Sequence, residues 1–300
     1  MSELRIIEVG PRDGLQNEPT PIPLEVKARF IANLIESGAK EIEVTSFVHP
    51  KWVPQLADAD ELLATIPRPE GVHFSALVPN RRGLDRALAS GVDRIALFTA
   101  ASEAFTTKNI NMTIAESLAE FRAVADAFRD AVPNAFIRGY VSTVVECPFA
   151  GPVAPSQVKD IVDQLIQIGV DEISLGDTIG VAIPDDIQRL ADALDPTLPP
   201  SQTAWHFHDT RGTAMANVAA MVERGYRAFD ASAGGLGGCP YAPGAGGNLA
   251  TEDLIYYLER KGLTTGWDLD RLVQASSEVF AHLNRPSASR VHQAVLAACR

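Results

Sequence analysis

Eight short runs rich in β-branched and aromatic residues recur along this chain, and longer segments with helical spacing of apolar residues separate them. The runs are LRIIEVG, EIEVTSF, VHFSALVP, VDRIALFTA, AFIRGYVST, DEISLGD, TAWHFHD and AFDASAGG. Helical segments such as LEVKARFIANLIESG and APSQVKDIVDQLIQIG end in glycine just before the next run, as helix C-caps do. Regular alternation of strands and helices is typical of a parallel sheet.

Eight strand-helix units in about 260 residues match the size of a (β/α)8 barrel, also called a TIM barrel. The structural alternative is a doubly wound open sheet, which usually carries a G-x-G-x-x-G turn after its first strand. This chain has GPRDGLQNE there. The sequence therefore predicts one α/β catalytic domain over residues 1–300, with the barrel at about 4–262 and a helical extension at about 263–300. In that extension DLDRLVQASSEVFAHLN predicts a helix on the barrel's outside or over its mouth.

Charge and cysteine usage restrict the partners and the compartment. A net charge of −12 and a pI near 5.0 oppose binding to nucleic acid or to an anionic membrane. No apolar run is long enough to span a bilayer, and no leader pattern precedes the first strand. The three cysteines are widely separated and odd in number, so we expect a reducing cytoplasm, with Cys147 and Cys299 structural or incidental. The expected partner is a small molecule.

Polar residues at the ends of the predicted strands are the candidates for an active site, because barrel enzymes build theirs where strands end and loops begin. These candidates are Arg12, Asp13, Gln16, Glu43, Ser46, Arg138, Tyr140, Asp177, Thr178, His206, His208, Cys239 and Asn248.

The stretch HFHDTRG places two histidines on one side of the seventh predicted strand. Side chains at i and i+2 of a strand point the same way, so His206 and His208 would face the barrel axis roughly 6–7 Å apart along the chain. Together with Asp13 they make a set of nitrogen and oxygen metal ligands, which favours Mg²⁺ or Mn²⁺ over structural zinc. The alternatives are two hydrogen-bonded core histidines and an aspartate that caps a turn.

Four other candidates also have simpler structural interpretations. Arg12 and Glu43 would form a buried ion pair, which is compatible with function because the carboxylate would orient the guanidinium. Asp177 would cap the turn that follows its strand. Cys239 lies in AGGLGGCPYAPGAGGN, and such a glycine-rich loop either delivers a thiol for proton transfer or is a surface loop.

Seven segments of the chain resemble one known family. They are VGPRDGLQNE, IEVTSFVHPKWVPQ, ASEAFTTKNIN, RGYVS, EISLGDTIG, HFHDT and GLGGCPYAPGAGGNLATEDL. In this order, from about residue 4 to about residue 260, they resemble the 3-hydroxy-3-methylglutaryl-CoA lyases, which are metal-dependent barrel enzymes. The resemblance implies cleavage of this acyl-CoA to acetyl-CoA and acetoacetate in leucine degradation and ketone-body formation. It also implies a divalent cation (Mg²⁺ or Mn²⁺) and a homodimer.

The resemblance also implies roles for individual residues. The metal ligands would be Asp13, His206, His208 and Asn248. Arg12 would stabilise the enolate, with Glu43 supporting it, and Asp177 and His206 would take part in removing the hydroxyl proton. Cys239 would serve in acid/base chemistry. Substrate-pocket positions would be Arg12, Gln16, Ser46, Arg138, Tyr140 and Thr178.

Two departures from the family pattern bear on the acyl group. Ala233 and Gly234 replace a Val-Ala pair and would loosen the exit of the eighth strand. Arg211, Gly212 and Thr213 replace Tyr-Gly-Gln after HDT, and the added cation would touch an acidic substrate or a phosphate, or face solvent. These changes keep open a lyase of the same mechanism for a longer 3-substituted 3-hydroxyglutaryl-CoA.

Other functions of related barrels fit the sequence less well. Enzymes that condense an acyl-CoA with a 2-oxo acid, and aldolases for 4-hydroxy-2-oxo acids, do not ordinarily carry the GGCPYA loop found here. A barrel that had become a binding or scaffold protein would have lost at least one metal ligand, whereas all four candidates are present.

Overall fold

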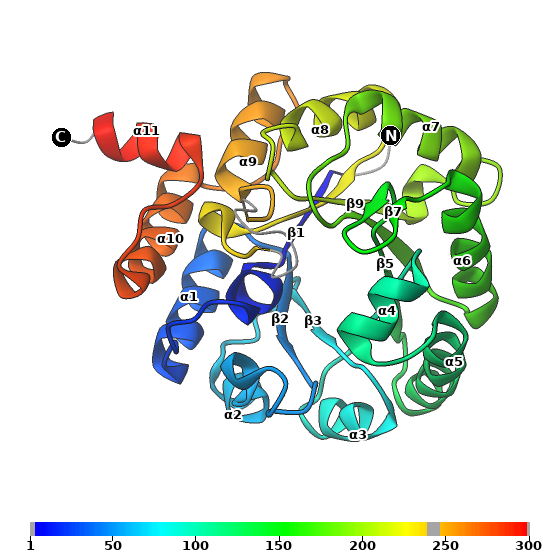
Figure 1. Ribbon diagram of the computed structural model, residues 1–300. Helices are drawn as coiled ribbons and strands as arrows, with labels where there is room; N and C mark the ends of the chain where they lie inside the picture. Colours follow the sequence, from blue (N-terminus) through cyan, green and yellow to red (C-terminus); the bar gives the residue numbers. More distant parts are fainter. Residues whose placement is uncertain (1–3, 239–246, 299–300) are drawn as a thin grey trace.

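Parallel strands close into a barrel in the computed structural model, which describes residues 4–238 and 247–298. The strand order is β1-β2-β3-β4-β5-β8-β9-β10, and pairing of β10 with β1 closes the ring (Figure 1). The barrel strands are β1 Arg5–Glu8, β2 Glu41–Ser46, β3 His73–Leu77, β4 Arg94–Ala100, β5 Phe136–Ser142, β8 Glu172–Asp177, β9 Thr203–Phe207 and β10 Ala228–Ala231. The predicted barrel is confirmed, and the open-sheet alternative is excluded.

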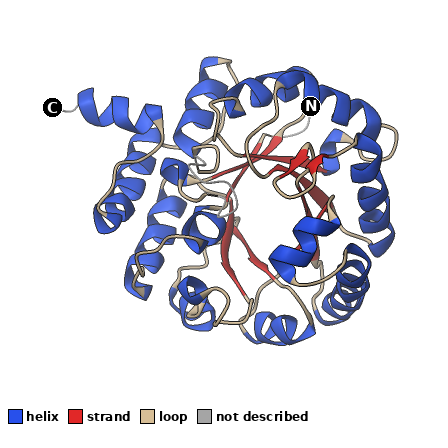
Figure 2. Ribbon diagram, in the orientation of Figure 1, coloured by secondary structure: helices blue, strands red, loops and turns tan. Residues whose placement is uncertain are grey.

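Helices surround the barrel on its outside, and one short helix, Glu103–Ile110, lies in front of the ring of strands in this view (Figure 2). They are α1 Leu24–Glu36, α2 Ala59–Thr65, α3 Arg81–Ala89, α4 Glu103–Ile110, α5 Ile114–Ala131, α6 Pro155–Ile168, α7 Pro184–Leu194, α8 Ala214–Glu223, α9 Thr251–Arg260, α10 Leu269–Leu283 and α11 Arg290–Ala298. Short elements complete the chain: η1 Gly10–Gly14, η2 Pro54–Leu56, η3 Pro200–Gln202, η4 Ala233–Gly235, and the hairpin of β6 Glu146–Cys147 with β7 Gly151–Pro152.

Local sequence explains where the helices begin and end. Helix α5 begins with a capping box, in which the Thr113 hydroxyl accepts the Glu116 N–H and the Glu116 carboxylate accepts the Thr113 N–H. Helix α6 ends at Gly169, whose φ of 89° lies in the left-handed region that favours glycine. Apolar residues of α6 at helical spacing, such as Val158, Val162 and Leu165, are fully buried. These signals explain why sequence periodicity located the helices.

The predicted C-terminal extension is helical and lies on the barrel's outside. Helix α10 packs against α1, so it does not cover the barrel mouth. The second helix of this extension, α11, projects away from the barrel (Figure 1).

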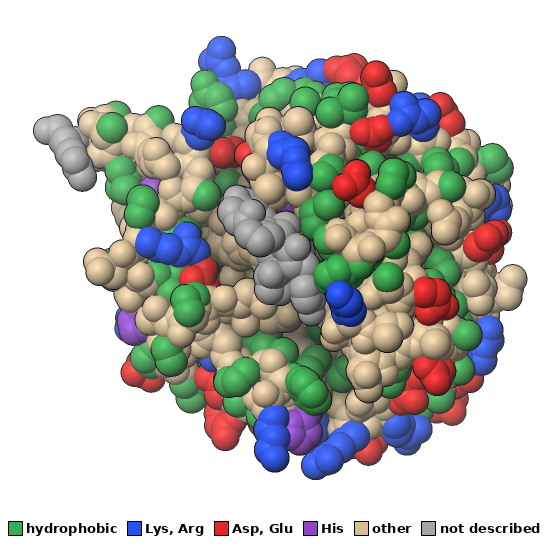
Figure 3. All heavy atoms as spheres, viewed as in Figure 1, with side chains coloured by type: hydrophobic (Ala, Val, Ile, Leu, Met, Phe, Trp, Pro, Cys, Tyr) green, Lys and Arg blue, Asp and Glu red, His purple; other side chains and the backbone are tan. Residues whose placement is uncertain are grey.

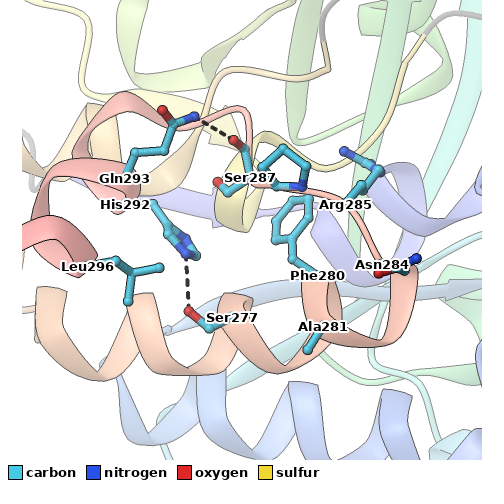
Figure 4. A pocket seen from close by; sticks show the side chains of 10 residues that line it. Ser277, Phe280, Ala281, Asn284, Arg285, Ser287, His292, Gln293 and Leu296 are labelled. Atoms are coloured by element: carbon cyan, nitrogen blue, oxygen red, sulfur yellow. Dashed lines mark hydrogen bonds between the residues drawn. The ribbon is translucent and has the colours of Figure 1, made fainter. Parts of the chain in front are cut away.

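An open hollow with a volume of about 450 Å³ lies between α10 and α11. Figure 4 shows its lining, in which His292 points at the Ser277 hydroxyl, at 3.1 Å, and Gln293 donates to the Ser287 carbonyl. None of the described candidate site residues lines this hollow. The polar groups of this hollow therefore hold the C-terminal extension together and are not part of the candidate active site.

The face in Figure 3 carries acidic and basic side chains interspersed around its periphery, without a continuous basic surface. Within residues 4–238 and 247–298, no helix combines the length and the apolarity needed to cross a bilayer.

The turn after β10 is tightly packed, contrary to the expectation that Ala233 and Gly234 loosen it. Both residues are buried. The Gly234 N–H donates to the Glu252 carboxylate at 2.7 Å, and the Gly234 carbonyl accepts the Ser287 hydroxyl at 2.9 Å. A Cβ on Gly234 would lie 2.0 Å from Cε2 of Phe280 on α10. The small residues therefore accommodate a large aromatic side chain of the C-terminal extension.

Replacing Gly234 by alanine is therefore expected to destabilise the protein strongly. The φ of +65° costs an L-residue roughly 1–2 kcal/mol, and the overlap with Phe280 roughly 1–3 kcal/mol more. Thermal and urea unfolding would measure the loss. Gly262→Ala is the matched control, because Gly262 has a φ of +82° but a Cβ added there would meet no neighbour within 4 Å. Equal losses at both positions would show that the Phe280 contact contributes nothing.

Candidate active site

A single π-helical turn directly after β1 places Arg12 and Asp13 at the mouth of the barrel. The Val9 carbonyl accepts the N–H groups of Arg12, Asp13 and Gly14 at 3.2, 2.8 and 3.1 Å. A Cβ on Gly14 would lie 2.8 Å from the Ser232 hydroxyl oxygen, so only glycine allows the turn to approach the end of β10 this closely. Single π-turns of this kind are frequent at functional sites.

Arg12 is held between two carboxylates. Its Nη2 donates to Glu43 Oε2 at 2.7 Å, its Nη1 donates to Asp13 Oδ1 at 2.5 Å, and its side chain is buried. The Tyr140 hydroxyl donates to the same Glu43 oxygen at 2.9 Å. Burial disfavours the charge, but Glu43 and Asp13 outweigh it and hold the pKa of Arg12 above its ordinary value. The predicted buried ion pair is confirmed, and it presents a permanent cation.

His206 and His208 do lie on one side of the chain. Their Nε2 atoms are 3.2 Å apart, and Asp13 Oδ2 is 3.9 Å from His206 Nε2. One ligand atom from each of Asp13, His206 and His208 lies within 4.8 Å of the others. A β-bridge between His208 and Asn248 brings the chain after β10 to the same place, where Asn248 Nδ2 donates to Asp13 Oδ2 at 2.9 Å. The structure thus gathers residues from three distant segments.

The donor set at this point fits a divalent cation. The Asn248 Oδ1 atom is buried and has no hydrogen-bond partner among residues 4–238 and 247–298. An amide oxygen is a ligand that Mg²⁺ and Mn²⁺ accept. Burial and the neighbouring His206 lower the pKa of His208 to about 4, so its imidazole is neutral at neutral pH and able to coordinate. Two imidazoles, one carboxylate and one amide oxygen are therefore available, from Asp13, His206, His208 and Asn248.

Sequence reasoning missed Asp230 on β10, whose carboxylate contacts the imidazole of His206. The Asp230 Oδ2 atom is 3.0 Å from His206 Nδ1 and accepts the Ser174 hydroxyl at 2.8 Å, while Oδ1 accepts Arg138 Nη2 at 2.5 Å. The available signal was a charged residue inside AFDA, an otherwise apolar and fully buried strand. Buried charges need partners, so such a residue indicates a polar network.

The predicted pocket residue Arg138 lies in this network inside the barrel. Its Nη1 donates to the Tyr140 hydroxyl at 3.2 Å, and its Nε is 2.9 Å from Glu172 Oε1. The guanidinium thus reaches the candidate site through Tyr140 and Asp230.

Asp177 takes the turn-capping role that the sequence indicated. Its carboxylate accepts the N–H groups of Val181 and Ala182 at 3.1 and 3.0 Å, and burial raises its pKa. Arg211, one of the departures from the family pattern, donates to the carbonyls of Ile179 and Gly180 at 2.9 and 3.2 Å. The added cation therefore joins the loops after β8 and β9.

The remaining candidates have varied surroundings. Ser46 Oγ accepts the Val48 N–H at 3.1 Å, and Thr178 Oγ1 accepts the Thr143 N–H at 2.8 Å. Gln16 is half-buried just after η1. Cys239 lies outside the described residues.

A (β/α)8 barrel whose mouth carries a cluster of candidate metal ligands and a buried arginine is typical of an enzyme. The model of the HMGL-like family matches residues 3–279, and the chain belongs to this family. It is 46% identical to the hydroxymethylglutaryl-CoA lyase of Pseudomonas mevalonii, covering 99% of this chain and 98% of that protein. It spans 61% of the length of the mitochondrial hydroxymethylglutaryl-CoA lyase of Arabidopsis thaliana, also at 46% identity.

A further relative and two solved structures bear on the ligand. A Pseudomonas aeruginosa protein, 46% identical over 98% of both chains, is named 3-hydroxy-3-isohexenylglutaryl-CoA/hydroxy-methylglutaryl-CoA lyase. The crystal structure of the hydroxymethylglutaryl-CoA lyase from Pseudomonas aeruginosa superposes with a TM-score of 0.95 at 46% identity, covering 99% and 98% of the two chains. An HMG-CoA lyase structure from Acinetobacter baumannii, in complex with coenzyme A and 3-methylmalate, has a TM-score of 0.92 at 38% identity, covering 97% and 95%.

Proposed function

We propose that this protein is a carbon-carbon lyase that cleaves 3-hydroxy-3-methylglutaryl-CoA to acetyl-CoA and acetoacetate. One observation carries the proposal: the buried Arg12–Glu43 pair lies directly beside the Asp13, His206, His208 and Asn248 cluster. A retro-Claisen cleavage needs both functions at adjacent points, because charge leaves an alcohol oxygen and appears on a thioester oxygen. The family and its named relatives supply the substrate.

The divalent cation would be held by the four ligand side chains, and we propose Mg²⁺ or Mn²⁺. When bound, it would lower the pKa of the substrate's tertiary alcohol. Asp177 is the proposed acceptor of the alcohol proton, because His206 would use Nε2 for the cation and Nδ1 for Asp230. Burial raises the pKa of Asp177, which brings this carboxyl closer to the basicity that proton removal requires.

Arg12 would act on the opposite end of the reaction. As the C2–C3 bond breaks, its electron pair moves into the thioester and forms the acetyl-CoA enolate, while the alcohol carbon becomes the ketone of acetoacetate. Arg12 is already oriented by Glu43, so it stabilises the developing negative charge without reorganisation. A proton then reaches the enolate carbon, and Cys239 is the proposed donor.

The sequence supports further proposals on setting and assembly. We place the reaction in the cytoplasm, in leucine degradation and ketone-body formation, and expect a homodimer.

The substrate's acyl group carries either a 3-methyl group or a longer 3-substituent. We favour the methyl compound, because the space beside Ala233 and Gly234 is filled by Phe280 and leaves no room of its own for a longer chain.

The decisive experiment measures acetoacetate release from 3-hydroxy-3-methylglutaryl-CoA by the purified, reduced protein with Mg²⁺, and again with excess chelator. We expect turnover of ordinary enzymatic size, roughly 1–10³ s⁻¹, that the chelator abolishes. The 3-isohexenyl compound is assayed in parallel and is expected to react with a lower kcat/KM. No cleavage of either compound by folded, Mg²⁺-loaded protein would refute the proposal, and preference for the longer compound would correct the acyl group.

A further inference from the structure

The carboxylate of Asp230 lies at the centre of a fully buried polar network within the barrel. Asp230 is 2% exposed and Ser174 is completely buried. Three groups point at its two oxygens: Arg138 Nη2 at Oδ1, and both the Ser174 hydroxyl and His206 Nδ1 at Oδ2. Three barrel strands, β5, β8 and β9, thus place a donor against one side chain of β10.

We infer that Asp230 is a positioning residue that fixes His206 as the Nδ1-protonated tautomer, so that Nε2 is free to bind the cation beside Asp13 and His208. The inference rests on the proposed metal-dependent function and deepens it.

The tautomer follows from what each group can donate. An ionised carboxylate only accepts hydrogen bonds, so the 3.0 Å contact requires the proton on His206 Nδ1. The carboxylate is ionised because the guanidinium of Arg138, a permanent cation, donates from Nη2 to its Oδ1 at 2.5 Å. Neutral His206 therefore carries its lone pair on Nε2, the atom that faces His208 Nε2 at 3.2 Å.

Arg138 makes this arrangement rigid. Its other carboxylate partner, Glu172, also pairs with Arg5, and Arg5 and Arg94 both pair with Glu41. These residues form a chain of alternating charges through the barrel, and it ends at Asp230. Three arginines face three carboxylates in this chain, and Arg138, Glu172 and Asp230 are its buried members. Arg138 therefore cannot turn away from Asp230 without leaving a buried charge unpaired.

Asp230→Asn reverses the tautomer while changing almost no volume. Arg138 can only donate, so the new amide would direct its oxygen at Arg138 and its NH₂ group at His206 Nδ1. His206 would then have to accept at Nδ1 and carry its proton on Nε2, which blocks coordination through that atom. Loss of such support to a metal-binding histidine typically weakens metal affinity roughly 10- to 100-fold.

The test titrates Mn²⁺ alone, by calorimetry, into the full-length, metal-stripped wild-type protein and the Asp230→Asn variant. We expect the variant's Kd to be about 10- to 100-fold higher. Ser174→Ala is the matched control. It removes a hydrogen bond from the same Oδ2 atom without imposing a tautomer, and it should change Kd by less than about fivefold.

A second measurement needs no variant to fold. In ¹⁵N-histidine-labelled, metal-free wild-type protein, at a pH where the imidazole is neutral, NMR should show His206 protonated at Nδ1. Protonation at Nε2 in the wild type, or equal Mn²⁺ affinity in wild type and Asp230→Asn, would overturn the inference while leaving the proposed lyase activity intact. Failure of the wild type to bind Mn²⁺ at all would overturn the metal site on which both proposals rest.

Discussion

Arg12→Met is expected to lower kcat/KM by about 10³-fold or more. Removing one neutral donor from an oxyanion site costs roughly 10²–10³ in rate. Arg12 is a buried cation that Glu43 orients, and in the proposed mechanism it faces the reacting thioester. Because the interaction forms mainly as negative charge develops on the enolate, the loss should appear in kcat more than in KM. Steady-state kinetics with 3-hydroxy-3-methylglutaryl-CoA would measure both.

Two further variants separate catalysis from folding. Removing Arg12 leaves Glu43 as a buried, unpaired carboxylate, so the single variant should also lose stability. The double variant Arg12→Met/Glu43→Gln removes that stranded charge and should recover most of the stability but none of the activity. Arg12→Lys keeps the charge but loses the two-armed contact with Glu43 and Asp13, and it should fall between the wild type and Arg12→Met. Wild-type turnover in folded Arg12→Met would refute the assigned role.

His208→Ala is expected to abolish both turnover and the stabilising effect of the divalent cation. A cation at 100 times its Kd stabilises a folded protein by about 2.7 kcal/mol, provided that it binds only the folded state. The wild type should therefore melt several degrees higher with Mn²⁺ than with chelator, whereas His208→Ala should show no such difference. Without His208 the ligand set loses one of its two imidazoles, and cleavage should fall below roughly 10⁻³ of the wild-type rate.

The control for this prediction is His282→Ala, which removes an exposed histidine of α10. This variant should keep both the activity and the Mn²⁺-dependent rise in melting temperature. If His208→Ala retained the Mn²⁺-dependent rise, the cation would bind elsewhere, and the cluster of Asp13, His206 and His208 would not be its site.

Much of the fold follows directly from the sequence pattern. Each of the eight predicted runs contains a barrel strand, because a fully buried parallel strand reads as a short apolar run wherever it occurs. The boundaries were less accurate at β9 and β10, which end at Phe207 and Ala231, before the predicted HD and SAGG. Beyond these residues the chain forms backbone turns and the bridge between His208 and Asn248 instead of the barrel's ladder. The pattern of apolar residues does not predict such turns or bridges.

The sequence predicted which residues form the candidate site, but it did not predict which of them contact one another. Strand periodicity placed His206 and His208 on one side, and the barrel's geometry indicated the end at which Arg12 and Asp13 would join them. The sequence marked Asp230 only as a charge within a buried strand, because its role depends on Ser174, His206 and Arg138 on three other strands. For the same reason Gly234 suggested a loose turn, although Phe280, more than forty residues later, packs against it.

The sequence by itself thus determined the alternation of strands and helices, the barrel and the types of ligand at its mouth, because hydrophobic periodicity and capping act over a few residues. Only the tertiary structure decided which carboxylate pairs with which cation, and which nitrogen of His206 faces Asp230 and which faces His208. The contacts of the site join residues that are 24 positions apart, as in His206 with Asp230, or 235 positions apart, as in Asn248 with Asp13. Closure of the barrel alone brings such residues within hydrogen-bonding distance, and no local pattern of side chains records it.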